Sequence, residues 1–138
     1  MSFEDIMIRE NDRVTGIVIN WGGPVTTQRL HVDPLMIRTK LVIDGTGHDA
    51  VVCNTILRKI PNAKIGGEFG ILGEKPMWSE VGERLAVDAT QEIYPGLIVA
   101  GMAANAATRA PRMGPVFGGM LLSGEKAAKL ALDRLKKI

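Results

Sequence analysis

The sequence contains one cysteine, Cys53, so no disulfide can form within the chain. No apolar run approaches the roughly 20 residues that a membrane-spanning helix needs, and the first residues lack the basic and apolar regions of a signal peptide. Basic and acidic side chains number 17 and 15, and the lysines and arginines are dispersed. We therefore expect a cytoplasmic protein with neither nucleic acid nor membrane as a partner.

Aromatic residues make up only 4% of the chain, whereas glycine occupies 16 of its 138 positions. Frequent glycine predicts turns, or backbone that must approach another group closely. The hydrophobic share of 46% and the charged share of 23% are those of an ordinary folded domain. We expect residues 1–138 to form a single domain with one hydrophobic core.

The order of the apolar segments predicts an α/β fold. Residues 3–10 and 13–21 are rich in β-branched and apolar side chains, and Asn11-Asp12 between them favours a hairpin turn. Residues 41–44 and 97–100 predict two short buried strands that run parallel. Because no βαβ unit precedes the hairpin, these strands lack neighbours, which indicates part of a larger sheet.

Three segments have the apolar spacing of helices: residues 45–60 after a glycine-rich start, residues 79–90 and residues 117–138. Ser79 is expected to be the N-cap of the second helix. One apolar face is predicted in the first helix, formed by Val52, Cys53, Ile56, Leu57 and Ile60. An apolar stripe is predicted in the last, formed by Phe117, Leu121, Gly124, Ala128, Ala131 and Leu135. Residues 21–34 and 61–78 are predicted as loops.

Both histidines of the chain, His31 and His48, stand in loops that flank the strand at 41–44. With Asp33 they could hold Zn²⁺ or Fe(II), because imidazole and carboxylate suit either ion. The alternative is that they are ordinary loop residues and that Asp33 ends a turn before Pro34. The spacing matches no standard zinc signature, so on spacing alone the second interpretation is favoured.

Two further groups near this strand have a chemical and a structural interpretation. The "DGTGHD" loop could cradle a phosphate, because it lies between a strand and a helix, but Gly45 and Gly47 could equally serve the turn alone. Cys53 could be a nucleophile, but its place on an apolar helix face favours an inert core thiol.

The stretch "AGMAANAATRAPRMGPVFGGM" joins small residues to two arginines directly after a predicted strand. Small residues would let a ligand approach the backbone, and Arg109 or Arg112 could hold a carboxylate or phosphate in a bidentate fork. The helix start near Gly118-Gly119 could also bind an anion. A surface loop with solvated arginines is the alternative, but the combination favours a binding site.

Several motifs together resemble the C-terminal half of the thiamine thiazole synthase family, in its archaeal, sulfide-dependent form. They are "NW", "HVDP", "DGTGHDA", "YPGLIVAGMAANA" and "PRMGPVFGGMLLSGEKAA". The resemblance covers essentially all 138 residues. It implies the C-terminal part of a flavoprotein-like, glutathione-reductase-type dinucleotide-binding fold, with a β-meander beside parallel strands and helices.

The resemblance also implies a reaction. The family converts NAD, glycine and a sulfur source into an adenosine-diphosphate-linked thiazole carboxylate, the precursor of the thiazole of thiamin. Fe(II) would be held by Asp33 and His48, with Asp33 reaching a neighbouring protomer's site in a ring-shaped homo-oligomer. The nucleotide-derived ligand would contact His31, Val32, Asp33 and Met102, and Arg112 would hold the carboxylate of glycine.

Two departures from the family pattern affect these expectations. The N-terminal Rossmann unit with its GxGxxG loop is missing, so we expect a fragment whose partner is that N-terminal half. His31 occupies the catalytic position where eukaryotic relatives carry a cysteine that donates its sulfur, so free sulfide is the expected source. Two alternatives stay open: a truncated domain with an assembly or regulatory role, or half of another FAD- or NAD-dependent oxidoreductase.

Overall fold

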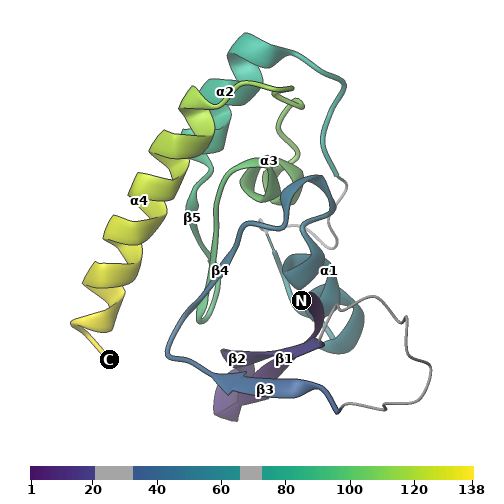
Figure 1. Ribbon diagram of the computed structural model, residues 1–138, viewed down its shortest axis with the longest axis vertical. Helices are drawn as coiled ribbons and strands as arrows, with labels where there is room; N and C mark the ends of the chain where they lie inside the picture. The colour runs from purple at the N-terminus through teal and green to yellow at the C-terminus, as the bar shows by residue number, and fades with distance from the viewer. Residues whose placement is uncertain (21–32, 66–72) are drawn as a thin grey trace.

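In the computed structural model, which describes residues 1–20, 33–65 and 73–138, two three-stranded sheets carry the chain (Figure 1). The first sheet is an antiparallel meander with the order β1-β2-β3. Its strands are β1 (Ser2–Arg9), β2 (Arg13–Asn20) and β3 (Leu35–Arg38). The predicted hairpin turn is confirmed, since Asn11 and Asp12 both adopt positive φ, a conformation that asparagine and aspartate tolerate well.

The second sheet is mixed, with the order β4-β6-β5. Its strands are β4 (Val42–Asp44), β5 (Gln91–Tyr94) and β6 (Leu97–Val99). The predicted parallel pairing is confirmed, because β4 lies parallel to β6. Strand β5, which the sequence did not predict, forms an antiparallel hairpin with β6 through Pro95 and Gly96. This turn also joins the two sheets, since the amide of Val14 donates to the carbonyl of Pro95 at 2.9 Å.

Four α-helices and two short 3₁₀ turns complete the described chain. They are η1 (Glu10–Asp12), η2 (Gly47–Asp49), α1 (Val51–Lys59), α2 (Ser79–Asp88), α3 (Met102–Thr108) and α4 (Gly118–Leu135). The first, second and last α-helices lie where the sequence predicts them, whereas α3 was not predicted. Figure 1 shows α1 beside the meander and α4 along one side of the chain. None of the described helices is long and apolar enough to cross a membrane.

The prediction that Ser79 caps α2 is wrong, because Ser79 is the first residue of the helix. The amide of Gly82 donates to the carbonyl of Trp78 at 2.8 Å, which makes Trp78 the N-cap. No side chain of the N-cap residue accepts a hydrogen bond there. The serine therefore begins the helix without capping it.

The core forms where α1 and α3 pack with β6 and the hairpin. The predicted apolar face of α1 is confirmed, since Val52, Cys53, Ile56 and Ile60 are buried and Leu57 is partly buried against the same cluster. Helix α3 contributes mainly alanine side chains, all of them buried. Its small residues thus permit close contact between helices in the core.

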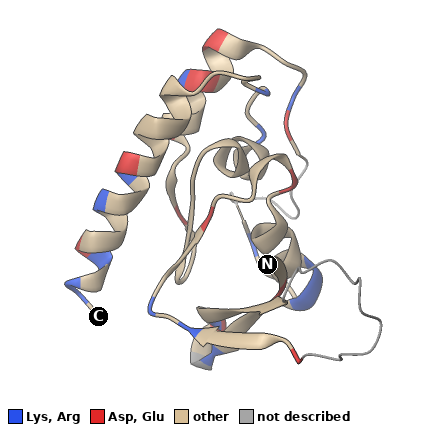
Figure 2. Cartoon of the chain, in the orientation of Figure 1, with Lys and Arg blue, Asp and Glu red and all other residues tan. Residues whose placement is uncertain are grey.

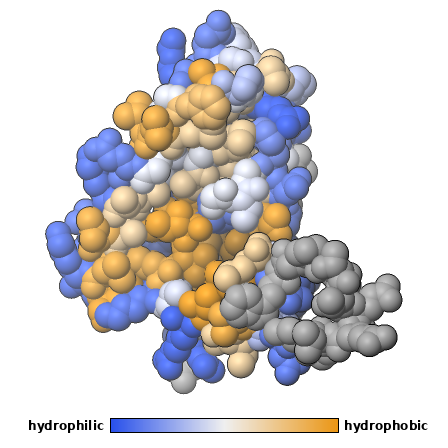
Figure 3. Space-filling view, in the orientation of Figure 1, coloured by the Kyte–Doolittle hydropathy of each residue, from blue (hydrophilic) through white to orange (hydrophobic). Residues whose placement is uncertain are grey.

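Most of the predicted stripe of α4 does not face the core, although Ala131 is partly buried against the cluster of Ile98, Ala100 and Ala127. Phe117 and Leu121 are 69% and 74% exposed, and Gly124, Ala128 and Leu135 are exposed as well. The helix instead buries a neighbouring line of small residues, Gly119, Ser123 and Ala127. In the space-filling view, apolar side chains are visible along the α4 side of the molecule (Figure 3). The periodicity predicted the helix correctly and its buried face wrongly.

Charged residues of both signs occur along α4 and are spread over the other elements (Figure 2). Lys59 of α1 pairs with Asp5 of β1, which ties the helix to the meander. Arg134 of α4 pairs with Glu92 of β5 at 2.5 Å. The lysines and arginines are therefore dispersed in the structure, as they are in the sequence.

Alanine at Gly82 should destabilise the fold. The added Cβ would lie 2.6 Å from the carbonyl oxygen of Pro111 and 3.0 Å from Cα of Met113, so backbone must move, and overpacking of this kind costs about 1–3 kcal/mol. Gly124 of α4 is the matched control, since a Cβ there meets nothing within 4 Å. Gly124→Ala should stabilise the helix by about 0.5–1 kcal/mol. Thermal unfolding measures both, and a Gly82→Ala variant as stable as the parent would contradict the contact.

Candidate functional site

The carboxylate of Asp44 organises the loop that carries His48. Asp44 ends β4 and is fully buried. Its Oδ1 accepts hydrogen bonds from the amide and the hydroxyl of Thr46, at 2.9 and 2.7 Å. Its Oδ2 accepts one from the amide of Cys53 in α1, at 3.2 Å. The buried charge is therefore compensated by polar groups of the loop and helix that follow it.

These contacts do not support the phosphate-cradle interpretation of the "DGTGHD" loop. The hydroxyl of Thr46 accepts from the amide of Val51 at 2.8 Å, and Asp44 occupies the amide of Cys53. Amides that a phosphate would use at the start of α1 are thus satisfied by the protein itself. Gly47 has a φ of 82°, so it serves the turn.

His48 lies in the η2 turn, which contacts α3. Its Nδ1 is 2.6 Å from Oε2 of Glu74, a residue 26 positions further along the chain. The side chain of Glu74 is only 8% exposed, whereas that of His48 is 32% exposed. The other carboxylate oxygen of Glu74, Oε1, is buried and has no hydrogen-bond partner among the residues that the structure describes. No sequence pattern singled out Glu74, because it lies in a segment predicted only as loop.

Arg112 lies in a segment that pairs with the residues after Glu74. The amide of Lys75 donates to the carbonyl of Ala110 at 3.0 Å, and the amide of Arg112 donates back to the carbonyl of Lys75 at 3.1 Å. Arg112 is exposed and lines a cleft of about 450 Å³. The cleft is lined by Glu74, Lys75, Pro76, Met77 and Arg112. The structure thus brings the partner of His48 and the predicted carboxylate-binding arginine to one cleft.

The side chain of Asn105 in α3 holds the segment that carries Arg112. Its amide nitrogen donates to the carbonyl of Gly82 in α2 at 3.0 Å and to that of Pro111 at 3.3 Å. Met113, next to Arg112, is completely buried. Arg109 is also exposed but lies at the end of α3, in a left-handed conformation, and it does not line this cleft.

The start of α4 is not available to an anion, contrary to the prediction for Gly118-Gly119. Oε1 of Glu83 in α2 accepts from the amide of Gly119 at 2.9 Å. A Cβ at Gly119 would lie 2.5 Å from Cγ of Glu83 and 2.7 Å from its carbonyl oxygen. The paired glycines therefore let α2 and α4 approach, and a carboxylate of the protein already occupies the helix N-terminus.

Met102, predicted to contact the nucleotide-derived ligand, is the first residue of α3 and is partly exposed. The preceding Gly101 has a φ of 61°, and its amide donates to the hydroxyl of Ser123 at 2.7 Å. That hydroxyl is also 2.5 Å from the hydroxyl of Thr90. This buried network fixes the turn between β6 and α3, and with it the position of Met102.

Two of the predicted ligand residues, His31 and Val32, lie outside the described residues, so their roles stay predictions. Asp33 is exposed and lies two residues before the start of β3. Figure 1 shows β3 at the lower end of the view and α3, which η2 contacts, in its upper half. Within residues 1–20, 33–65 and 73–138, no three His, Cys, Asp or Glu side chains are grouped to hold a metal ion.

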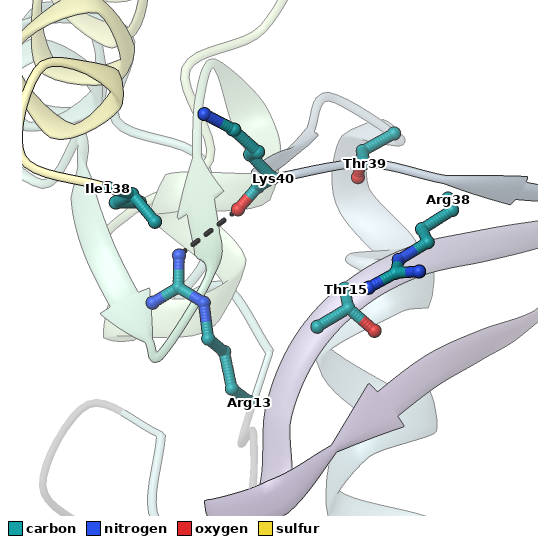
Figure 4. A pocket seen from close by; sticks show the side chains of 6 residues that line it. All are labelled: Arg13, Thr15, Arg38, Thr39, Lys40 and Ile138. Atoms are coloured by element: carbon teal, nitrogen blue, oxygen red, sulfur yellow. Dashed lines mark hydrogen bonds between the residues drawn. The ribbon is translucent and has the colours of Figure 1, made fainter.

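A second cleft, of about 420 Å³, lies between the meander and the end of the chain (Figure 4). It is lined by Arg13, Thr15, Arg38, Thr39, Lys40 and Ile138. The guanidinium of Arg13 donates to the carbonyl of Lys40 at 3.1 Å, as Figure 4 shows. None of the residues predicted for the functional site lines this cleft, so the cleft beside Glu74 and Arg112 is the better candidate.

The two sheets and the helices packed on them make this an α/β protein. The chain belongs to the Thi4 family, whose profile matches residues 1–117. It is 98% identical to the thiamine thiazole synthase of Methanosarcina mazei and 94% identical to that of Methanosarcina acetivorans, each over all 138 residues. The enzyme of the same name from Methanothermobacter thermautotrophicus is 48% identical over 136 residues, or 99% of this chain.

A solved structure of a similar protein has the same fold as this chain. The crystal structure of THI4 from Thermovibrio ammonificans matches 98% of this chain with a TM-score of 0.84 and 46% sequence identity. The chain covers 51% of that structure and 52% of each of the three relatives named above. It therefore spans about half the length of the curated relatives that it matches.

Cys53 should be chemically inert in the folded protein. Burial, and then the nearby carboxylate of Asp44, raise the pKa of its thiol well above the ordinary value. At a pH of about 8.5, where an ordinary cysteine is half ionised, the native thiol should resist alkylation, and it should react once the chain is unfolded. Because the folded pKa is the higher one, this group's contribution to stability is present below the unfolded pKa and is lost as pH rises above it. Rapid labelling of the native chain, followed by mass spectrometry, would contradict the assignment.

Proposed function

We propose that this chain forms half of a thiamine thiazole synthase, which makes the adenosine-diphosphate-linked thiazole carboxylate from NAD, glycine and sulfide in the cytoplasm. The observation that carries the proposal is the 98% identity to the Methanosarcina mazei enzyme along the whole chain. A truncated regulatory domain, or half of another oxidoreductase, has no comparable support. The partner of this chain would be the other half of the enzyme, which the family members carry in the same chain.

The proposal extends to the fold of the complete protein. The mixed sheet would be the C-terminal part of a glutathione-reductase-type dinucleotide-binding fold. In the described chain β4 pairs with β6 alone, and the side chain of Ile43 on this strand is 46% exposed. An edge strand with an exposed apolar side chain is consistent with a larger sheet.

The donor set fits an iron site that is completed by another protomer. We propose that Fe(II) is held by His48 and by Asp33 from a neighbouring protomer in a ring-shaped homo-oligomer. Imidazole nitrogen and carboxylate oxygen suit Fe(II), which when bound would supply a Lewis acid with open positions for reactants. The exposure of Asp33, and the separation of β3 from α3 along the molecule (Figure 1), support a role for Asp33 outside its own chain.

The other site residues would bind the organic substrates. Arg112 would hold the carboxylate of glycine in a bidentate fork, and Met102 would contact the nucleotide-derived ligand together with His31, Val32 and Asp33. The exposed guanidinium at the cleft supports the first role. His31 would occupy the catalytic position without supplying sulfur, since a histidine has none to give.

Product formation in a complete chain that carries this half should require added sulfide. The only cysteine of this half, Cys53, is completely buried, so it is a poor sulfur donor. The protein would be incubated with NAD, glycine and Fe(II), with and without sulfide, and product and intact protein mass would both be measured. We expect product only with sulfide and no change in protein mass. Product without sulfide, with one sulfur lost from Cys53, would refute the proposal.

Arg112→Lys should raise the concentration of glycine needed for half-maximal rate, because an ammonium cannot reproduce the two parallel hydrogen bonds of a guanidinium. Loss of charge-assisted hydrogen bonding of this kind corresponds to about 1.5–3 kcal/mol, or on the order of tenfold or more in apparent glycine affinity. Arg109→Lys is the matched control, since Arg109 is equally exposed but does not line the cleft. Steady-state kinetics on both variants test the assignment, and equal effects at the two positions would show that it is wrong.

A further inference from the structure

Glu74 contacts His48 and also lines the cleft of Arg112. The sequence analysis predicted no role for this residue. We propose that Glu74 is a positioning residue that fixes the ring orientation and the tautomer of His48 for binding a divalent metal ion. The inference rests on the function proposed above and adds a residue to that site. It is carried by the contact between Nδ1 of His48 and Oε2 of Glu74 and by the burial of the Glu74 side chain.

The contact favours a proton on Nδ1 of His48. When Glu74 is ionised its oxygens can only accept hydrogen bonds, and Nδ1, at 2.6 Å from Oε2, is then the donor. In the neutral imidazole the proton on Nδ1 leaves the lone pair on Nε2, which is the form that binds a metal. A metal-binding histidine almost always donates its other ring N–H to a carboxylate, a carbonyl or a water. The pair of His48 and Glu74 has this arrangement.

The difference in exposure between the two side chains supports the same role. Glu74 is held at 8% exposure, while 32% of the side chain of His48 is exposed. The buried partner can thus hold the ring from one side while another part of the ring stays accessible to a metal ion. Pairing of the neighbouring Lys75 with the backbone of Ala110 and Arg112 fixes the segment that carries Glu74.

The second carboxylate oxygen of Glu74 is consistent with a role beyond stability. Within residues 1–20, 33–65 and 73–138 no group hydrogen-bonds Oε1, which is buried, and a buried polar atom without a partner lowers stability. Such groups are rare in folded proteins and call for an explanation.

The test measures the affinity for Fe(II) alone, without substrates, by anaerobic competition with a chromophoric chelator. It uses a complete chain that carries this half. Glu74→Ala should weaken binding about 10–100-fold, the usual effect of removing such a partner. Glu74→Gln, whose amide oxygen still accepts from Nδ1, should fall between Glu74→Ala and the parent. Glu80→Ala is the control, because Glu80 is exposed on α2. The affinity of this variant for Fe(II) should match that of the parent.

A second readout separates positioning from stability. Thermal unfolding of the metal-free Glu74→Gln variant should show no loss of stability, since the change removes a buried charge and keeps the shape. The ligand-field spectrum of the Co(II)-loaded Glu74→Ala variant should differ from that of the parent, because no acceptor then holds the ring of His48 in one orientation, and Glu74→Gln should show a smaller difference. Parent-like affinity and spectrum in Glu74→Ala would overturn the inference. If Glu74→Ala does not fold, parent-like affinity and spectrum in Glu74→Gln would overturn it.

His48→Ala distinguishes this inference from the proposed function. We expect His48→Ala to lose Fe(II) binding. Suppose that His48→Ala loses Fe(II) binding while both Glu74 variants bind Fe(II) as tightly as the parent. Only the role of Glu74 is then refuted. If His48→Ala binds Fe(II) with the affinity of the parent, His48 is not a ligand, and both the iron site and the role of Glu74 are refuted.

Discussion

The arrangement of the candidate site depends on one buried carboxylate, that of Asp44. A charge removed from water must be compensated by hydrogen bonds or by another charge, and here the donors are the amide and hydroxyl of Thr46 and the amide of Cys53. These hydrogen bonds connect β4 to the loop that follows it and to α1. Because His48 lies between these anchors, its turn is fixed against α3 before any ligand is considered. The site is positioned by a residue that takes no part in its proposed chemistry.

Close packing explains small residues in the glycine- and alanine-rich stretch and in the helix that packs on it. Gly119 of the stretch and Gly82 of α2 allow backbone contacts that any Cβ would obstruct, and Asn105 hydrogen-bonds both α2 and the residue before Arg112. Close packing of helices and close approach of a ligand both require small residues. The sequence pattern therefore cannot distinguish the two, and the structure assigns these residues to packing. Arg112 alone of this stretch is left exposed at the cleft with Glu74.

The features that were predicted correctly are those determined by residues close together in the sequence. The hairpin around Asn11-Asp12, the parallel strands and the buried face of α1 follow from turn chemistry and from apolar periodicity. The parts that were missed depend on contacts between distant segments. Helix α3 consists mainly of alanine, so it lacks the alternation of apolar and polar faces by which a helix is predicted. Glu74 contacts His48, which lies 26 positions earlier in the sequence. The metal-ligand roles of Asp33 and His48 came from family resemblance, since their spacing alone favoured the opposite interpretation.

The openness of the site has a physical consequence for its chemistry. Asp33 and Arg112 are exposed, and His48 is partly exposed, so charges placed there by this chain would be screened by water. Hydrogen bonds and charges stabilise a transition state most effectively where water is excluded. The chain thus provides orientation, through Asp44, Asn105 and Glu74, but not desolvation. Since it spans about half the length of its relatives, surfaces that exclude water from this site would come from the other half of the proposed enzyme and, in the proposed ring, from a neighbouring protomer.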